Sequence, residues 1–293
     1  MKLKRTIALM MSLCMIIALL AGCTSDKENE TSSNTEIHTP TFNIGIKDDG
    51  TGASEQTDIE STKTTSEPTE KQSVKVTIPE GYSFMQIANT LEKKGVCTAK
   101  AFYNAAQSYQ VKSFTIPSSS DRCFKLEGYL FPDTYEFYKN DDPEDVIRKM
   151  LNNYRAKSGM PTDRQLIIAS IIEKEVRSDE QMKMVSSVFY NRINKGMRLD
   201  SDPTREYVND YITGNSLLSG DTSKYAALYN TYKCKIPAGP ICSPGARAIA
   251  AAKNPASSEY LYFFFGNDNQ NHYSKTLEEH NEQMNKYGVQ YGN

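Results

Sequence analysis

The feature that most constrains the fold is an apolar run too uniform for a surface helix. Residues 166–175 read Leu-Ile-Ile-Ala-Ser-Ile-Ile-Glu-Lys-Glu, with apolar side chains on nearly every helical face until the last three positions. A helix of this kind must be covered by other elements on all sides. We therefore predict a buried helix inside a sizeable core, with carboxylates at its C-terminal end.

The two carboxylates of this run point in different directions. At about 100° per residue, Glu173 shares a face with Leu166 and Ser170, whereas Glu175 points about 200° away. A carboxylate held against apolar side chains is desolvated, which raises its pKa and lets it carry a proton near neutral pH. Glu173 could therefore act as a general acid. The alternative is structural, with both carboxylates ending the helix and pairing with basic side chains such as Arg192.

Length and charge exclude several classes of protein. The chain has 293 residues, with 34 Lys and Arg against 36 Asp and Glu. This length allows about two domains of roughly 100–200 residues each. The charge balance argues against a basic nucleic-acid binder, and the polar composition argues against a protein that spans a membrane several times.

The N-terminus predicts export. Residues 1–5 carry three positive charges, Thr6 to Ala21 is almost wholly apolar, and Gly22 and Cys23 follow. This is the plan of a secretory signal peptide. Leu-Ala-Gly-Cys at 20–23 reads as a lipobox, so we expect residues 1–22 to be removed and Cys23 to be lipidated at the extracytoplasmic face of the cell membrane. The alternative is a single uncleaved transmembrane helix.

Ordered structure is expected from residue 73 onward. Residues 23–72 are rich in Thr, Ser and Glu with hardly a large apolar residue, which predicts a disordered tether. Val74 to Ile78 alternates as a half-buried strand. Helical spacing of apolar residues from Phe84 to Leu91, and again from Ala99 to Tyr109, predicts two short helices. With a return strand, residues 73–122 would form a small module of LysM size.

Residues 123–293 are predicted to be mainly helical. Asp142 can cap a helix that has Pro143 at its first position. An aromatic strand is expected at Tyr260 to Phe265, with a partner near residues 272–274. The fold class is therefore α+β. Capping-box spacing marks further helix starts at Thr162 with Gln165, Ser178 with Gln181, and Thr276 with Glu279.

Polar, rigid residues cluster in this second region. Amide, hydroxyl and aromatic side chains of this kind line saccharide clefts, where they match sugar hydroxyls and stack on sugar rings. Taken singly, each is more often a turn or a cap. The candidates for substrate contact, or for orienting Glu173, are Asn191, Asp202, Thr204, Tyr229 and Asn230.

Taken together, these segments resemble one family. From Val74 to the end, the chain is similar to the MltG (YceG-like) endolytic murein transglycosylases. The motifs that carry the resemblance are Glu-Gly-Tyr-Leu-Phe-Pro-Asp-Thr-Tyr (127–135), Ala-Ser-Ile-Ile-Glu-Lys-Glu (169–175), Val-Phe-Tyr-Asn-Arg (188–192), Gly-Met-Arg-Leu (196–199), Asp-Pro-Thr (202–204), Tyr-Asn-Thr-Tyr (229–232), Gly-Pro-Ile (239–241) and Ser-Pro-Gly (243–245).

The resemblance implies an activity and an acid. It implies cleavage of the β-1,4 bond between N-acetylmuramic acid and N-acetylglucosamine of nascent glycan strands, with the muramic 6-hydroxyl closing a 1,6-anhydro ring. Because that nucleophile is intramolecular, one Glu can protonate the leaving oxygen and then take the hydroxyl proton. The resemblance places this role on Glu173, with Glu127 and Glu175 as second candidates. Glu127 is also a candidate for substrate contact.

The resemblance further implies a LysM-like module from Val74 and peptidoglycan strands as substrate, with cell-wall synthases as candidate partners. We expect no cofactor, and no metal either, because the spacing of Cys234, Cys242, His272 and His280 does not match the usual short spacings of zinc ligands. Departures from the family pattern affect the anchor and the shape of the cleft. Residues 234–238 replace the usual Gly-Leu-Pro-Pro, and Arg205 and Glu206 stand where an apolar residue is common. A non-catalytic peptidoglycan-binding scaffold and a hydrolase that releases reducing ends remain the rival functions.

The cysteines of the ordered part are candidates for disulfides. An even count in an oxidising compartment favours bridges, although free buried thiols are equally compatible. The pairing that respects the domain division joins Cys97 to Cys123 and Cys234 to Cys242.

Overall fold

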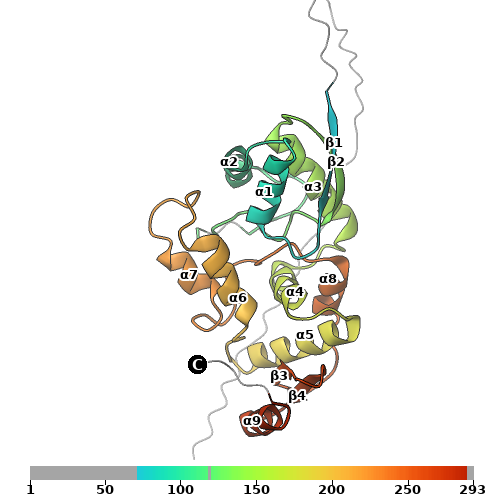
Figure 1. Cartoon of the computed structure of the whole chain (residues 1–293), viewed down its shortest axis with the longest axis vertical. Coiled ribbons are helices and arrows are strands. Elements are labelled where there is room, and N and C mark those ends of the chain that lie inside the picture. Colours follow the sequence, from blue (N-terminus) through green and yellow to red (C-terminus); the bar gives the residue numbers. More distant parts are fainter. Residues whose placement is uncertain (1–70, 118–119, 289–293) are drawn as a thin grey trace, which may run out of the picture. The chain divides into compact units, whose positions relative to one another are not determined.

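The computed structural model describes residues 71–117 and 120–288. The predicted signal peptide, the lipidation site Cys23 and the tether up to residue 70 lie outside this part of the chain. In chain order, the elements are β1 (Ser73–Ile78), α1 (Phe84–Lys93), α2 (Ala99–Ser108), β2 (Asp133–Tyr138), α3 (Pro143–Lys157), α4 (Asp163–Glu175), α5 (Asp179–Asn194), α6 (Asp202–Tyr207), the π-helix η1 (Val208–Ile212), α7 (Ser223–Tyr229), α8 (Ala246–Lys253), β3 (Tyr262–Phe265), β4 (Asn271–Ser274) and α9 (Leu277–Lys286). These helices and two small antiparallel sheets confirm the α+β class (Figure 1).

The first sheet pairs distant parts of the chain. β1 and β2 form an antiparallel ladder from the Ser73–Tyr138 pair to the Ile78–Asp133 pair. The return strand of the predicted module is therefore formed by residues 133–138, beyond the boundary that the sequence placed at residue 122. The reason is that residues 122–132 are buried except for Lys125, so the chain enters the core before it returns to β1.

Stacked aromatic rings join this module to the rest. Phe84, the first residue of α1, stacks on Phe102 of α2 and on Phe124, with ring centroids 5.3 and 5.2 Å apart. All three rings are buried. The same apolar cluster continues through Leu166 and Ile171 of α4, so the module and the helical region share one core.

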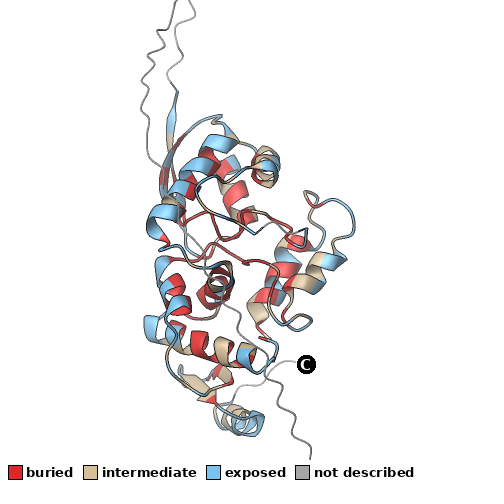
Figure 2. Ribbon diagram, turned by 180° about the vertical axis from the view of Figure 1, so that it is seen from behind, coloured by how far each residue is buried: buried red, intermediate tan, exposed pale blue. Residues whose placement is uncertain are grey.

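The central helix predicted from the sequence is confirmed. Every residue of α4 from Leu166 to Glu173 is buried. α5 and α8 pack against α4, and α6 also contacts it. Figure 2 shows buried residues concentrated where these elements meet. Because α4 is covered on all faces as far as Glu173, that carboxylate has little access to solvent.

The predicted helix starts are also confirmed. Asp142 caps α3, with Pro143 in its first turn. Capping boxes are formed at Thr162, Ser178 and Thr276. None of the helices in the described ranges combines the length and apolar content that crossing a bilayer requires.

One glycine permits a close approach between two loops. Gly128 has a φ of +83°, and a Cβ there would lie 2.6 Å from Cβ of Pro240. Only glycine adopts this conformation without strain while leaving room for the proline ring. The aromatic segment after Leu126 therefore packs directly on the loop that carries Gly239 and Pro240.

The second sheet forms the C-terminal end of the described chain. In the antiparallel β3–β4 pair, Tyr262 lies opposite Ser274 and Phe265 lies opposite Asn271. The aromatic strand and its partner are confirmed to within two residues of their predicted positions. α9 packs on both strands, and β3 also contacts α5.

Candidate active site

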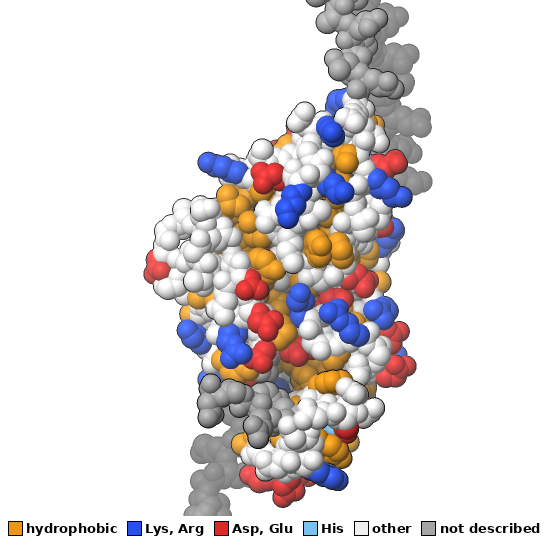
Figure 3. Space-filling view, viewed as in Figure 1, with side chains coloured by type: hydrophobic (Ala, Val, Ile, Leu, Met, Phe, Trp, Pro, Cys, Tyr) orange, Lys and Arg blue, Asp and Glu red, His pale blue; other side chains and the backbone are white. Residues whose placement is uncertain are grey.

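A cavity of about 480 Å³ lies beside the C-terminal end of α4. It is lined by residues from α4, α5, the start of α6, β3, β4 and α9, and by Tyr232. Acidic and hydrophobic side chains gather beside each other over α5 and α6 (Figure 3). Glu175 lines this cavity, and Glu173 is not among its lining residues.

Glu175 is a carboxylate of the cavity lining with a raised pKa. Burial raises its pKa to about 7, and the negative charges of Asp202 and Glu206 act in the same direction. Ser201 Oγ donates a hydrogen bond to Glu175 Oε1 at 2.6 Å, which opposes the rise. A carboxyl group with a pKa near neutrality can both donate and accept a proton at working pH.

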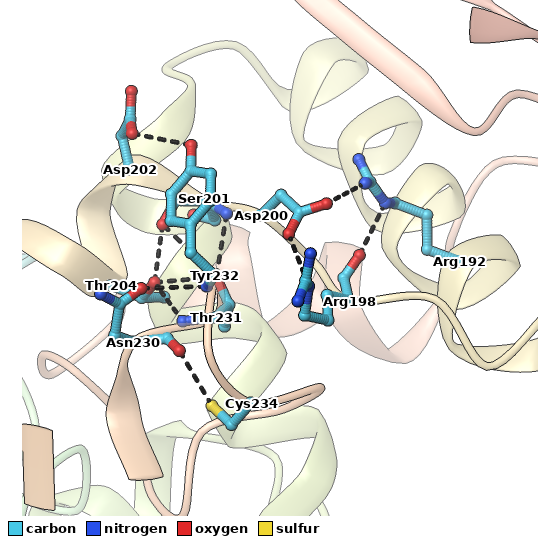
Figure 4. Close-up of polar contacts among 10 residues, drawn as sticks. All are labelled: Arg192, Arg198, Asp200, Ser201, Asp202, Thr204, Asn230, Thr231, Tyr232 and Cys234. Atoms are coloured by element: carbon cyan, nitrogen blue, oxygen red, sulfur yellow. Dashed lines mark hydrogen bonds and ion pairs between the residues drawn. The ribbon is translucent and has the colours of Figure 1, made fainter. Parts of the chain in front are cut away.

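A buried hydroxyl network holds Ser201 (Figure 4). Ser201 N–H donates to Thr231 Oγ1 at 2.9 Å, and Thr204 Oγ1 donates to the Ser201 carbonyl at 2.6 Å. Thr204 and Thr231 are also joined, with 2.8 Å between their hydroxyl oxygens. All three side chains are buried. Ser201 precedes α6 but makes no side-chain cap, because its hydroxyl is directed to Glu175.

Asp200 turns the chain into this network. Its φ is +49°, in the left-handed region that few residues other than glycine and Asn or Asp adopt. Its carboxylate accepts from Arg192 at 2.6 Å and from Arg198 at 3.3 Å (Figure 4). Arg192 Nε also donates to the Arg198 carbonyl at 2.8 Å. Two arginines therefore hold a strained turn directly before Ser201, consistent with strain stored beside a functional group.

Asp202 stands at the exposed side of the cavity. Tyr232 Oη donates to its carboxylate at 2.9 Å, and Arg205 pairs with it at 2.9 Å. The Arg205 guanidinium also lies 5.4 Å from the centre of the Tyr232 ring. The basic residue that departs from the family pattern is thus part of the rim, where it fixes an acid and a tyrosine.

Glu173, the predicted acid, has a different environment. Its side chain is 3% exposed, and it accepts from the backbone N–H of Gly245 at 3.0 Å. Burial raises its pKa, the Gly245 hydrogen bond lowers it, and the negative charge of Glu80 raises it. The structure therefore brings Glu173 to the loop before α8 and Glu175 to the cavity.

Glu127 is a buried carboxylate between elements. It is 1% exposed, and the N–H of Phe84 donates to its two oxygens at 2.9 and 3.0 Å. Tyr207 Oη donates to it at 2.8 Å. Burial raises its pKa to about 7. These contacts tie α1 to α6 and leave the carboxylate without access to the cavity.

The remaining predicted contact residues divide into two groups. Asp202 lines the cavity, and Thr204 donates a hydrogen bond to the carbonyl of Ser201. Asn191 Nδ2 donates to the carbonyls of residues 258 and 260, at 2.8 and 3.0 Å, and so holds the segment before β3. Tyr229 is fully buried, and Asn230 Oδ1 accepts from the N–H of residue 232 at 2.9 Å. These three shape loops of the site.

Four side chains of the site were not singled out by sequence reasoning as site residues. Arg192 was considered only as a partner for helix-end carboxylates, and Ser201, Tyr232 and Tyr262 only as parts of longer segments. In the sequence, the feature that could have pointed to Ser201 is its position directly before the Asp-Pro-Thr motif. Within the described ranges, no group of three or more His, Cys, Asp and Glu side chains is arranged to hold a metal ion.

The four cysteines that are candidates for disulfides are separate thiols in the structure. Cys97, Cys123, Cys234 and Cys242 are free thiols in the structure. Cys234 Sγ donates to the carbonyls of residues 228 and 230, both at 3.3 Å, whereas Cys242 Sγ donates to the Ser170 carbonyl at 3.2 Å. The two thiols are thus directed to different carbonyls. Burial raises the pKa of Cys97 to about 11 and that of Cys123 to about 12, which makes both unreactive.

Comparisons with known proteins identify the family of the chain. Residues 52–286 match the YceG-like family. The chain is 30% identical over 262 residues to an endolytic murein transglycosylase of Streptococcus pneumoniae serotype 2, covering 75% of this chain and 47% of that protein. It is 35% identical over 178 residues to an endolytic murein transglycosylase of Bacillus subtilis, covering 55% and 48% respectively. The chain thus spans about half the length of the curated relatives it matches.

A solved structure is also similar. The crystal structure of a YceG-like protein from Listeria monocytogenes aligns with a TM-score of 0.58 and 32% sequence identity. The alignment covers 71% of this chain and 75% of that one.

Proposed function

The chain belongs to the YceG-like family, and on that premise we propose that it is an endolytic lytic transglycosylase of peptidoglycan. Its substrate would be the nascent glycan strand, cut at the β-1,4 bond between N-acetylmuramic acid and N-acetylglucosamine to leave a 1,6-anhydro end. Such cuts would terminate strand elongation. The observation that carries the proposal is a carboxyl group with a pKa of about 7 in a cavity lined by polar and aromatic side chains.

The acid in this proposal is Glu175. Its protonated carboxyl donates to the glycosidic oxygen as the bond to the muramic C1 breaks. The resulting carboxylate then takes the proton of the muramic 6-hydroxyl as that oxygen bonds to C1. The same carboxyl group serves both steps, so the reaction needs no second carboxylate and consumes no water. The Ser201 hydrogen bond stabilises the ionised form that exists between the two steps.

Asp202 would have a supporting role. Hydrolases that activate water need a second carboxylate as base or nucleophile. Asp202 lines the same cavity, but Arg205 and Tyr232 both bind one of its two oxygens, Oδ1. We assign it to the rim that contacts substrate, together with Tyr232. The buried position of Thr204 supports a positioning role for that residue.

Two substitutions at the end of α4 test the assignment. Glu175→Gln and Glu173→Gln each remove one carboxylate from the same helix without changing its length. The sugar ends released from purified peptidoglycan would be identified by mass spectrometry. We expect anhydro-muramic ends from the parent and from Glu173→Gln, and none from Glu175→Gln.

Each of the other outcomes would favour a different acid or a different function. Loss of cleavage with Glu173→Gln alone, in a protein that still folds, would restore the acid that the family resemblance placed there. Reducing ends would make the protein a hydrolase. Binding without cleavage by the parent would favour a non-catalytic scaffold.

The N-terminal parts complete the proposal. We assign residues 1–22 to a lipoprotein signal peptide, Cys23 to lipidation, residues 23–72 to a tether and the chain after β2 to the catalytic domain. The strand–helix–helix–strand order of β1, α1, α2 and β2 supports a LysM-like module in the region beginning at residue 73. Anchoring at the extracytoplasmic face would keep the enzyme close to cell-wall synthases, where strands are made.

A further inference from the structure

The cavity has a second wall that the proposed chemistry does not use. Part of the lining comes from α4, α5 and the start of α6 and includes Glu175. The other part comes from β3, β4 and α9. We call Tyr262, Phe265, Asn271 and Leu277 the aromatic wall, and all of them line the cavity.

Exposed apolar side chains concentrate at this cavity. Five large hydrophobic side chains in the described ranges are exposed: Tyr138, Met160, Tyr232, Phe265 and Leu277. Three of them line the cavity, and Phe265 at 58% and Leu277 at 50% are the most exposed of the five. Apolar side chains gathered in this way mark a place where a ligand covers them.

The wall is stiff. The Arg192 guanidinium lies 5.4 Å from the centre of the Tyr262 ring, and the His280 ring lies 5.3 Å from it on the α9 side. Phe265 is held by the β3–β4 ladder directly opposite Asn271. A rigid ring beside an amide offers both an apolar face and a hydrogen-bond donor to one ligand.

Unpaired polar atoms lie in the same elements. Asn271 Nδ2 and His280 Nδ1 are buried and have no hydrogen-bond partner within the described part of the chain. Buried polar atoms are nearly always paired, so unpaired ones call for an explanation. A ligand bound against the wall would supply the missing partner for the amide.

Charge restricts what can bind. Asp200 and Asp202 line the cavity, but each is already paired, Asp200 with Arg192 and Arg198 and Asp202 with Arg205. Burial and the charge of Arg192 lower the pKa of His280, so this lining residue adds no positive charge at neutral pH. The residues that line the cavity therefore offer no unpaired cation to a ligand with carboxylates, such as a stem peptide.

We propose that the aromatic wall is a glycan subsite that holds uncharged sugar residues of the strand next to the bond cut at Glu175. The C–H faces of sugar rings stack on Tyr262 and Phe265, because these faces are apolar and match the π surface of an aromatic ring. The Asn271 amide donates to a ring substituent, and Leu277 covers the outer sugar. The inference rests on the proposed function, since it takes the glycan strand as the ligand of this cavity.

Binding can be measured without cleavage. In the Glu175→Gln protein, isothermal titration calorimetry with chitohexaose, an uncharged β-1,4-linked sugar polymer, reports the subsite alone. We expect Phe265→Ala and Leu277→Ala each to weaken binding about tenfold. Both side chains are half-exposed or more, so neither change should unfold the protein. Tyr138→Ala and Met160→Ala, at exposed hydrophobic residues elsewhere, should leave the affinity unchanged.

The outcomes separate this inference from the proposed function. Equal affinity in the parent and in Phe265→Ala and Leu277→Ala, or no binding of chitohexaose by the parent, would overturn the subsite. Binding of a free stem peptide that these two changes weaken would also overturn it, in favour of a peptide site. If chitohexaose binds through the wall but the parent enzyme leaves no anhydro ends, the subsite stands and the proposed reaction fails.

Discussion

Removing the hydroxyl of Ser201 should let the enzyme work at a higher pH. Ser201 Oγ donates to Glu175 Oε1 at 2.6 Å, and the pKa of this carboxyl is about 7. The hydrogen bond favours the ionised carboxylate. In Ser201→Ala that support is lost, while burial and the charge of Asp202 continue to favour the protonated form. The pKa of Glu175 must therefore rise.

The size of the rise follows from the hydrogen bond. A hydrogen bond to a charged group contributes about 1.5–3 kcal/mol, and one pKa unit corresponds to about 1.4 kcal/mol. The pKa of Glu175 should thus increase by about one to two units. Since the acid acts only while protonated, the alkaline limb of kcat/KM should move up by the same amount.

The assay is the release of soluble fragments from peptidoglycan between pH 5 and 10. Ser186→Ala is the matched control, because the Ser186 hydroxyl is also buried but has no hydrogen-bond partner in the described ranges. Its alkaline limb should stay in place. Ser201→Thr retains a hydroxyl and should restore the parent profile. A limb that stays or moves down in Ser201→Ala would refute the assignment of Glu175 as the acid.

Three further predictions concern stability and the thiols. Because burial raises the folded pKa of Glu127 to about 7 from an ordinary 4.5, its contribution to stability is complete below about pH 4.5 and is lost as pH rises through 7. Urea unfolding should show that Glu127→Gln removes about 3 kcal/mol of this pH dependence, and an unchanged slope would contradict the burial argument. Gly128→Ala should lower the free energy of unfolding by about 3 kcal/mol or more, since the new Cβ would meet a proline ring at 2.6 Å. Gly214→Ala, also at positive φ but in open space, should cost only about 1 kcal/mol. Equal costs for the two substitutions would rule out the clash with the proline ring. Peptide mapping of the unreduced protein should recover Cys234 and Cys242 as separate thiols, whereas a linked peptide would support the pairing expected from the sequence.

Local chemistry made much of the fold predictable. A capping box depends on residues only three positions apart, so Thr162, Ser178 and Thr276 marked their helices correctly. The apolar run of α4 predicted its burial because an all-apolar helix has only one stable environment. The pairing of β1 with residues 133–138 was less accessible, since strand partners are chosen by the whole core and not by either strand.

The candidate active site, too, was predictable from the sequence only in part. The sequence alone determined that α4 would be buried, that it would end in two carboxylates and that these would point about 200° apart. It could not determine which of the two reaches a cavity, because that depends on what packs against each face. Only the tertiary structure brought Ser201 and the β3–β4 hairpin to Glu175, and Gly245 to Glu173. These contacts form between residues far apart in the chain, where burial and hydrogen bonding of the complete fold decide which carboxyl keeps a proton.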